Sequence, residues 1–119
     1  MRISELSAKT QVSVHRLRRY EADGLIQSQR LPNGYREYDD PTVKHVVFIA
    51  MSREMGFSLT FIAEYLPRFK AGTLSAQDMI DAILARVAEI DQLIAEQKAL
   101  RKKLMDHIGW FKTQARRKP

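Results

Sequence analysis

Apolar residues recur at helical spacing in the first part of the chain, in short runs that are separated by capping and turn residues. Ser4 can cap a helix over residues 5–10, and Ser13 can cap a second helix that is apolar along one side. Gly24 stands where a helix commonly ends in a left-handed residue. Two short helices joined by a tight turn predict a helix-turn-helix.

The next segment has the pattern of a two-stranded hairpin. Asn33-Gly34 lies between extended flanks, and Asn-Gly is the strongest short-range signal for such a turn. From Tyr35 to Tyr38, aromatic and charged residues alternate as they do in a strand with two different faces. The sequence therefore predicts a wing with Asn33-Gly34 at or near its tip.

Two further helices are predicted before residue 72. An Asp cap and Pro41 at the first helical position begin one of them, and Ser58 caps the other. Pro67 is expected to stop or kink the second helix, because proline lacks the backbone donor and clashes with the preceding turn. The expected buried face of the first helix is Val43, Val46, Val47, Ala50, Met51 and Met55.

The last segment predicts one long helix. Residues 75–111 contain no proline and a single glycine, which allows a helix about 55 Å long. A lone helix cannot bury an apolar seam that repeats every three and four residues, so this helix needs a partner. The seam is interrupted at Gln97 and Arg101, and it consists of Ile80, Ile83, Val87, Ile90, Ile94, Leu104, Ile108 and Phe111.

These patterns predict a mainly α-helical protein in three parts. Residues 1–72 form a winged helix-turn-helix domain, residues 73–112 form the long dimerisation helix, and residues 113–119 form a disordered basic tail. No apolar run is long enough to span a membrane, and no signal-peptide pattern is present, so we expect a cytoplasmic protein.

Charge adds a candidate partner to this picture. The 119 residues carry a formal net charge of +6, divided as +4 over residues 1–36, −5 over residues 37–97 and +7 over residues 98–119. Two basic ends suit a nucleic acid or another anionic surface. Three arginines and a histidine fall within residues 15–19, on the predicted second helix.

The sequence offers no catalytic or metal-binding set. It has no cysteine, which removes disulfides and thiolate metal sites together. His15, His45 and His107 are scattered, and no Ser/His/Asp set, paired carboxylates or glycine-rich phosphate loop appears. We expect no enzyme activity, no metal site and no cofactor.

Several short motifs, in order and at this spacing, resemble the MerR family of bacterial transcription regulators. The resemblance is close over Ile3 to Leu66 and is that of a short member without a separate effector domain. Its motifs are Ile3-Ser4-Glu5-Leu6, Val12-Ser13-Val14, Leu17-Arg18-Arg19-Tyr20-Glu21, Gly24-Leu25-Ile26, Asn33-Gly34-Tyr35-Arg36-Glu37-Tyr38-Asp39 and Met55-Gly56-Phe57-Ser58-Leu59 with Ile62. Departures from the family pattern are Gln11 for a turn glycine, Arg19 for an aromatic residue and Phe61 for an acidic one.

The resemblance implies a sequence-specific, DNA-binding transcription regulator. Family members form homodimers through an antiparallel coiled coil of the long helix. They bind double-stranded promoter DNA at a roughly palindromic operator and distort an overlong spacer, so that RNA polymerase engages both promoter elements. The residues expected to form the dimer are Ile80, Ile83, Val87, Ile90, Ile94, Leu104 and Ile108.

The expected DNA contacts lie on the second helix, the wing and one later helix start. His15 and Arg16, near the start of the helix, are candidates for base edges, and Arg18 matches the arginine of the family motif. Tyr20 either donates its hydroxyl to a phosphate or belongs to the core. The full set is Ser13, His15, Arg16, Arg18, Arg19, Tyr20, Gly34, Tyr35, Arg36 and Ser58.

Two other functions remain open from the sequence. One is a sensor of a small organic molecule, with an aromatic pocket at the dimer interface; the same residues would otherwise be hydrophobic core and the end of the coil. The other is a coiled-coil adaptor that binds a protein partner through its basic helix. The wing and the helix-turn-helix argue against it, because an adaptor needs neither. The aromatic residues concerned are Phe57, Phe61, Tyr65, Phe69, Trp110 and Phe111.

Overall fold

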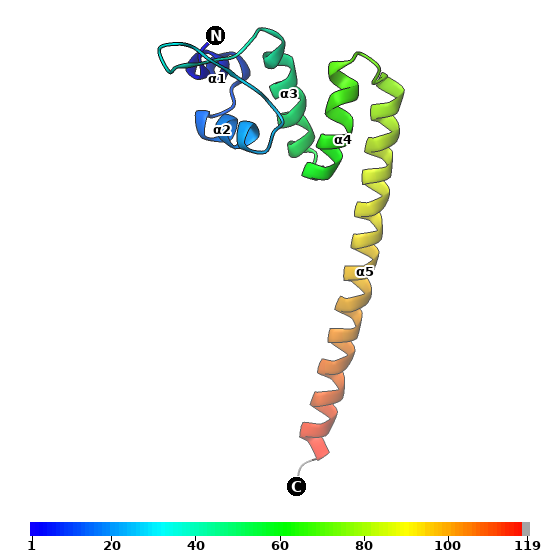
Figure 1. The fold of residues 1–119 in the computed structure, drawn as a ribbon. Helices are drawn as coiled ribbons and strands as arrows, with labels where there is room; N and C mark the ends of the chain where they lie inside the picture. Colours follow the sequence, from blue (N-terminus) through cyan, green and yellow to red (C-terminus); the bar gives the residue numbers. More distant parts are fainter. Residues whose placement is uncertain (118–119) are drawn as a thin grey trace. The chain divides into compact units, whose positions relative to one another are not determined.

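The computed structural model of the chain describes residues 1–117 and separates into two units, Met1–Ser75 and Ala76–Pro119. Lys118 and Pro119 lie outside the described residues. The first unit contains four helices and a two-stranded hairpin, and the second is a single helix (Figure 1). This division falls three residues after the predicted boundary at residue 72.

The first two helices, α1 (Ile3–Thr10) and α2 (Val14–Ala22), form the predicted helix-turn-helix. Ser4 does not cap α1. Arg2 is the capping position instead, because its carbonyl oxygen accepts the first helical bond, from the amide of Leu6 at 3.1 Å. Gln11 ends α1 with a φ of 58°, in the left-handed region that costs a non-glycine residue about 1 kcal/mol.

The predicted hairpin is present, with two residues in each strand. Strands β1 (Gln29–Arg30) and β2 (Arg36–Glu37) are antiparallel, and Arg30 lies opposite Arg36. Gly34 has a φ of +86°, which favours glycine at this position of the turn. Asn33-Gly34 therefore lies at the tip, as the sequence predicts.

Helix α3 (Pro41–Glu54) begins as expected but buries a different face. The side chain of Asp39 accepts a hydrogen bond from the amide of Thr42 at 3.2 Å, and the bonds from Thr42 lower the pKa of this carboxyl. Val46 is buried as predicted, but Val47 and Met51 are exposed, and Ile49 and Ser52 are buried in their place. The face is rotated because α3 packs against both α1 and α4 and must bury the arc between them.

Helix α4 (Leu59–Lys70) is capped as predicted, but Pro67 does not end it. The Ser58 hydroxyl accepts from the amide of Phe61 at 3.1 Å. The helix continues for one turn beyond Pro67 because this turn is held by tertiary contacts. Phe69 stacks on Phe48 of α3 with ring centroids 4.5 Å apart, and Lys70 donates to the carbonyl of Leu25 at 3.3 Å.

The core of the N-terminal unit joins all four helices and the base of the wing. It consists chiefly of large apolar side chains that are almost completely buried, and their burial supplies the main driving force for folding this unit. Tyr38, directly after β2, is 1% exposed and is a member of this core. The other members with the lowest exposure are Leu6, Leu17, Ile26, Val46, Ile49 and Ile62.

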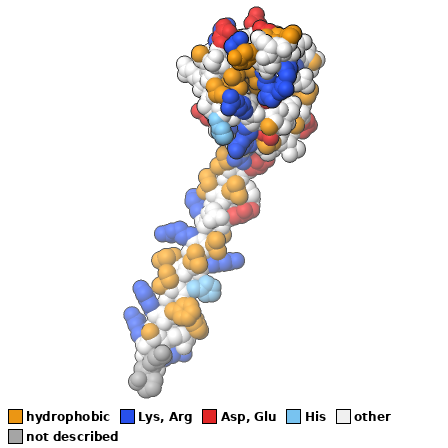
Figure 2. All heavy atoms as spheres, turned by 60° about the vertical axis from the view of Figure 1, so that its left-hand side comes forward, with side chains coloured by type: hydrophobic (Ala, Val, Ile, Leu, Met, Phe, Trp, Pro, Cys, Tyr) orange, Lys and Arg blue, Asp and Glu red, His pale blue; other side chains and the backbone are white. Residues whose placement is uncertain are grey.

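Helix α5 (Ala76–Arg117) forms the second unit, and none of its described side chains is buried. Its 42 residues extend about 63 Å. The helix continues through residues 113–117, where a disordered tail was expected, because these residues have no helix breaker and can extend the preceding turns. Figure 2 shows apolar side chains at the surface along the helix. Among residues 1–117, no helix is both long and apolar enough to cross a bilayer.

Replacement of Pro67 by alanine is expected to stabilise the N-terminal unit. The variant restores a donor inside α4, and the free energy of unfolding should rise by about 1 kcal/mol. Pro41→Ala is the matched control, because proline at a first helical position removes no helical bond. Thermal unfolding at one protein concentration measures both changes. A lower melting temperature for Pro67→Ala than for the parent protein contradicts the expectation.

Candidate nucleic-acid interface

Helix α2 presents a basic side away from the core. The Ser13 hydroxyl caps it by accepting from the amide of Arg16 at 3.1 Å. Leu17 and Tyr20 are the buried residues of the helix. The exposed residues include all four basic ones, namely His15, Arg16, Arg18 and Arg19. This arrangement leaves four exposed basic side chains on the side of the helix that can meet a polyanion.

Arg16 and Tyr20 are linked one helical turn apart. The guanidinium Nη2 of Arg16 donates to the hydroxyl oxygen of Tyr20 at 2.9 Å, and Tyr20 itself is 5% exposed. Both sequence interpretations of Tyr20 therefore have a structural counterpart. Its ring belongs to the core, and its hydroxyl hydrogen remains available for an acceptor outside the protein, because the oxygen is the acceptor of this bond.

Glu21, at the end of α2, connects the helix to the wing. One carboxylate oxygen accepts from Arg36 Nη1 at 2.7 Å and the other accepts from the Tyr38 hydroxyl at 2.6 Å. Burial and, after it, the hydrogen bond to the neighbouring Glu21 carboxylate together raise the pKa of Tyr38 to about 12. The phenol therefore stays protonated at neutral pH and donates to Glu21.

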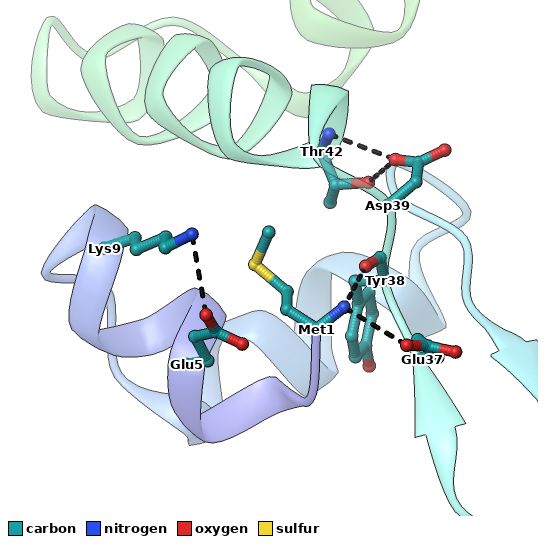
Figure 3. Close-up of polar contacts among 7 residues, drawn as sticks. All are labelled: Met1, Glu5, Lys9, Glu37, Tyr38, Asp39 and Thr42. Carbon is teal, nitrogen blue, oxygen red and sulfur yellow. Dashed lines mark hydrogen bonds and ion pairs between the residues drawn. The ribbon is translucent and has the colours of Figure 1, made fainter.

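The beginning of the chain also holds the base of the wing (Figure 3). The Met1 amino group donates to the carbonyl oxygen of Tyr38 at 2.6 Å, and the Tyr38 amide donates to the carbonyl of Met1 at 2.7 Å. The same amino group lies 3.6 Å from a carboxylate oxygen of Glu37. These contacts attach the end of β2 to the residue that precedes the capping position of α1.

The structure brings several of the expected residues together around one cleft. Arg18 from α2 and Gly34, Tyr35 and Arg36 from the wing all line it. His15 and Arg19 are exposed separately on α2, and Ser58 caps α4. Arg2 also lines the cleft, and sequence reasoning did not identify it. Neither did it assign a role to Glu21, although a carboxylate at the end of a strongly basic helix was a usable signal.

The aromatic residues considered for a ligand pocket contact other aromatic rings instead. Phe61 stacks between Phe57 and Tyr65, with ring centroids at 3.9 and 4.0 Å. Both faces of Phe61 are therefore covered, and no face is left for a bound aromatic molecule. Trp110 and Phe111 lie in the other unit, edge to face at 4.8 Å. The structure thus favours mutual packing for Phe57, Phe61 and Tyr65, and packing on Phe48 for Phe69.

The described residues contain no candidate metal site. No group of three or more histidine, aspartate or glutamate side chains is placed to hold an ion within residues 1–117. His45 lies at the edge of the Phe69 ring, 6.4 Å between centroids, and burial lowers its pKa. A half-buried histidine that stays neutral is ordinary core chemistry.

The Tyr38–Glu21 contact predicts how stability responds to alkali. The folded state holds the pKa of Tyr38 near 12, above the ordinary value of 10, so its contribution is complete below pH 10 and is lost between pH 10 and 12. Tyr38→Phe should be less stable than the parent protein at pH 8 and should lose less stability up to pH 11. Urea unfolding at each pH measures this. Tyr35→Phe, which removes an exposed phenol, is the control, and an equally steep decline in Tyr38→Phe contradicts the assignment.

Comparison with known proteins agrees with this geometry. A family model described as the MerR HTH family regulatory protein matches residues 1–68, and one described as MerR, DNA binding, matches residues 43–107. The mercuric resistance operon regulatory protein of Bacillus cereus is 34% identical over 106 residues, which are 88% of this chain and 80% of that protein.

Solved structures give the same result. The transcription regulator PbrR691 from Ralstonia metallidurans CH34, in complex with lead(II), aligns with a TM-score of 0.70 at 30% identity, over 89% of this chain and 83% of that one. HiNmlR, a MerR family regulator lacking the sensor domain and bound to promoter DNA, aligns with a TM-score of 0.59 at 19% identity, over 86% and 78%; this second likeness shows the fold. These relatives are regulators and not enzymes, and the chain belongs to the MerR family of DNA-binding transcription regulators.

Proposed function

We propose that the protein binds promoter DNA as a homodimer, with α2 in the major groove and the wing on the neighbouring backbone. The observation that carries the proposal is the exposed basic side of α2 beside the wing arginine, with Glu21 holding the two elements together. A recognition helix meets base edges with its first residues, which assigns His15 and Arg16 to sequence readout. The later residues, Arg18 and Arg19, then face phosphates.

Other expected contacts fit roles in positioning. Arg36 donates to Glu21, so its first effect is on the orientation of the wing. The bond from Arg16 leaves the Tyr20 hydroxyl hydrogen free for a phosphate oxygen. The Ser58 hydroxyl and the amides at the start of α4 are of the kind that bind a phosphate at a helix N-terminus. Ser13 caps α2, and Gly34 and Tyr35 shape the tip of the wing.

Dimer formation through α5 is supported by its uncovered apolar seam. Seam residues that a folded chain would normally bury are exposed, with values from 36% for Ile83 to 64% for Phe111. An apolar groove on the helix is lined by Ile90, Leu93 and Ile94. Contact with a second copy would remove this surface from water, which is the usual driving force for a coiled coil.

The charges along α5 favour an antiparallel pair. Residues 76–97 contain five carboxylates and one arginine, whereas residues 98–117 contain seven basic residues and one aspartate. In an antiparallel homodimer, the acidic half of each helix lies beside the basic half of the other. A parallel pair would align like charges, which is destabilising.

Such a dimer presents α2 twice and would bind two inverted half-sites. Family membership extends the proposal to distortion of the promoter spacer. Through this distortion the regulator acts on RNA polymerase indirectly. A rigid pair of recognition helices binds best to DNA whose two half-sites can be aligned with both helices. The free energy needed to bend or untwist the DNA depends on its sequence, so this deformation contributes to specificity. The protein would act in the cytoplasm, where bacterial promoters are transcribed.

The inducing signal is not carried over from the relatives. The Bacillus cereus relative is named for mercury resistance, and the PbrR691 structure contains lead(II). These soft metals prefer thiolate ligands, and the present sequence contains no cysteine. Metal sensing of that kind is therefore not part of the proposed function.

Arg18→Ala is expected to lower operator affinity more than tenfold while leaving the dimer intact. Selection of bound duplexes from a random library supplies the operator, and two inverted half-sites are expected. The loss follows from removing a cation that no carboxylate neutralises among the described residues. Titration of labelled operator measures the affinity. Lys112→Ala, in the other unit, is the control, and equal affinities for Arg18→Ala and the parent protein contradict this assignment.

Ile94→Lys is expected to convert the dimer to a monomer at micromolar concentration. The substitution places a charge in the middle of the exposed apolar seam, where burial without a partner is costly. Gln92→Lys adds the same charge about 200° around the helix and should leave the dimer intact. Sedimentation equilibrium distinguishes the two. A parent protein that is monomeric in this experiment rules out the coiled-coil dimer.

A further inference from the structure

A cleft lies between the start of α1, the exposed side of α2 and the wing. Its volume is ≈ 540 Å³, and it is lined by three arginines from three separate elements, Arg2, Arg18 and Arg36. The remaining lining residues include Ser4 and Tyr35, and none of them is acidic. A concave surface of this charge attracts an anion, because its walls contribute no compensating carboxylate.

The three arginines differ in how much of their charge is free. Arg36 has its ion pair with Glu21 at 2.7 Å. Among the described residues, the structure places no carboxylate within ion-pair distance of Arg2 or Arg18. The free positive charge of the cleft therefore belongs to Arg2, which precedes α1, and to Arg18, in the middle of α2.

Arg2 is held in place by an aromatic platform. Its guanidinium carbon lies 4.0 Å from the centroid of the Tyr35 ring, close to the tip of the wing. A cation–π contact of this kind occupies the flat face of the guanidinium and leaves the N–H groups at its edge free to donate. The backbone of Arg2 is also fixed, because Met1 pairs with Tyr38 and α1 begins at Ile3.

The first turn of α1 adds donors to the same place. Ile3 and Ser4 line the cleft, and the leading amides of a helix have no partner within it. Oxygen atoms of an anion in the cleft would thus meet guanidinium groups from two sides and backbone donors from a third. This chemistry suits a phosphate group, which accepts several hydrogen bonds at once.

We propose that Arg2 and Arg18 together bind one phosphate of the DNA backbone in this cleft, with the Tyr35 ring as the platform that orients Arg2. This inference rests on the proposed function, because it names a further contact of the same DNA-binding surface. It also assigns different roles to the arginines of the cleft. Arg36 positions the wing through Glu21, and Arg2 supplies the phosphate contact at the edge of the wing.

The test compares Arg2→Gln with the parent protein on the selected operator and on an unrelated duplex. Affinity should fall about fivefold on both, because a phosphate contact does not read sequence. The slope of log affinity against log salt should become shallower by about 0.9, as expected for one released counterion. Arg2→Lys should restore most of the slope. Lys9→Gln is the matched control, since Lys9 lies on α1, the helix that Arg2 precedes, pairs with Glu5 and does not line the cleft.

Two more measurements complete the test. Tyr35→Leu should weaken binding, and the double variant Arg2→Gln/Tyr35→Leu should be no weaker than Arg2→Gln, because both act through one contact. Inorganic phosphate at millimolar concentration should not raise the melting temperature of the parent protein above that of Arg2→Gln. A phosphate-dependent rise that needs Arg2 would assign the cleft to a free anion instead and overturn the proposal.

The outcomes separate this inference from the proposed function. If Arg2→Gln binds like the parent protein with the same salt slope, while Arg18→Ala loses affinity, the Arg2 contact is wrong and the regulator assignment stands. If the parent protein shows no salt-dependent DNA binding, both fail. Circular dichroism of Arg2→Gln excludes a folding defect as the cause of weaker binding, and a melting temperature equal to that of Lys9→Gln is expected.

Discussion

The carboxylate of Glu21 holds the basic helix and the wing in one arrangement, and the rest of the DNA-binding surface depends on it. Its two oxygens accept from Arg36 and from the buried Tyr38, so one acidic side chain joins a surface arginine to the core. The wing has only two residues in each strand, and such a short ladder is marginal by itself. Side-chain bonds must therefore fix its orientation, and Glu21 provides them from the helix that the wing accompanies.

The arginines of this surface fall into two groups, those that fix its geometry and those whose charge is available to a ligand. Arg36 contributes to geometry, because its charge is balanced by Glu21, whereas Arg18 and Arg2 have no carboxylate partner among the described residues and keep theirs for a ligand. Arg16 combines both effects, since it bonds the hydroxyl of the buried Tyr20 and remains exposed. A polyanion thus meets cations whose positions are set before binding. Such preorganisation lowers the entropy lost when DNA binds.

The two units of the chain meet different physical demands. The N-terminal unit buries a compact core and can satisfy its apolar residues within itself. Helix α5 buries none of its described side chains, and its acidic and basic halves remain uncompensated along one helix. An antiparallel second copy would cover the seam and pair the opposite charges with the same contact. The two arguments are independent, because one concerns apolar area and the other concerns the order of charges along the helix.

The sequence by itself determined the elements whose signals are local. Ser13 and Ser58 as caps, Asn33-Gly34 as the turn and the apolar seam of α5 could all be identified, because capping, turn formation and periodicity involve residues a few positions apart. The basic face of α2 was equally clear. The family motifs then indicated which of these elements bind DNA and which form the dimer.

Only the tertiary structure decided features that depend on distant neighbours. Pro67 stays inside α4 because Phe69 packs on Phe48, and the buried face of α3 is set by the two helices on either side of it. The partners of Glu21 lie 15 and 17 residues away, and Arg2 meets Tyr35 across the wing. Local propensity does not encode such contacts, since they form only when the core has brought the segments together. For this reason the sequence identified a basic helix, and the fold showed which arginines are free to bind.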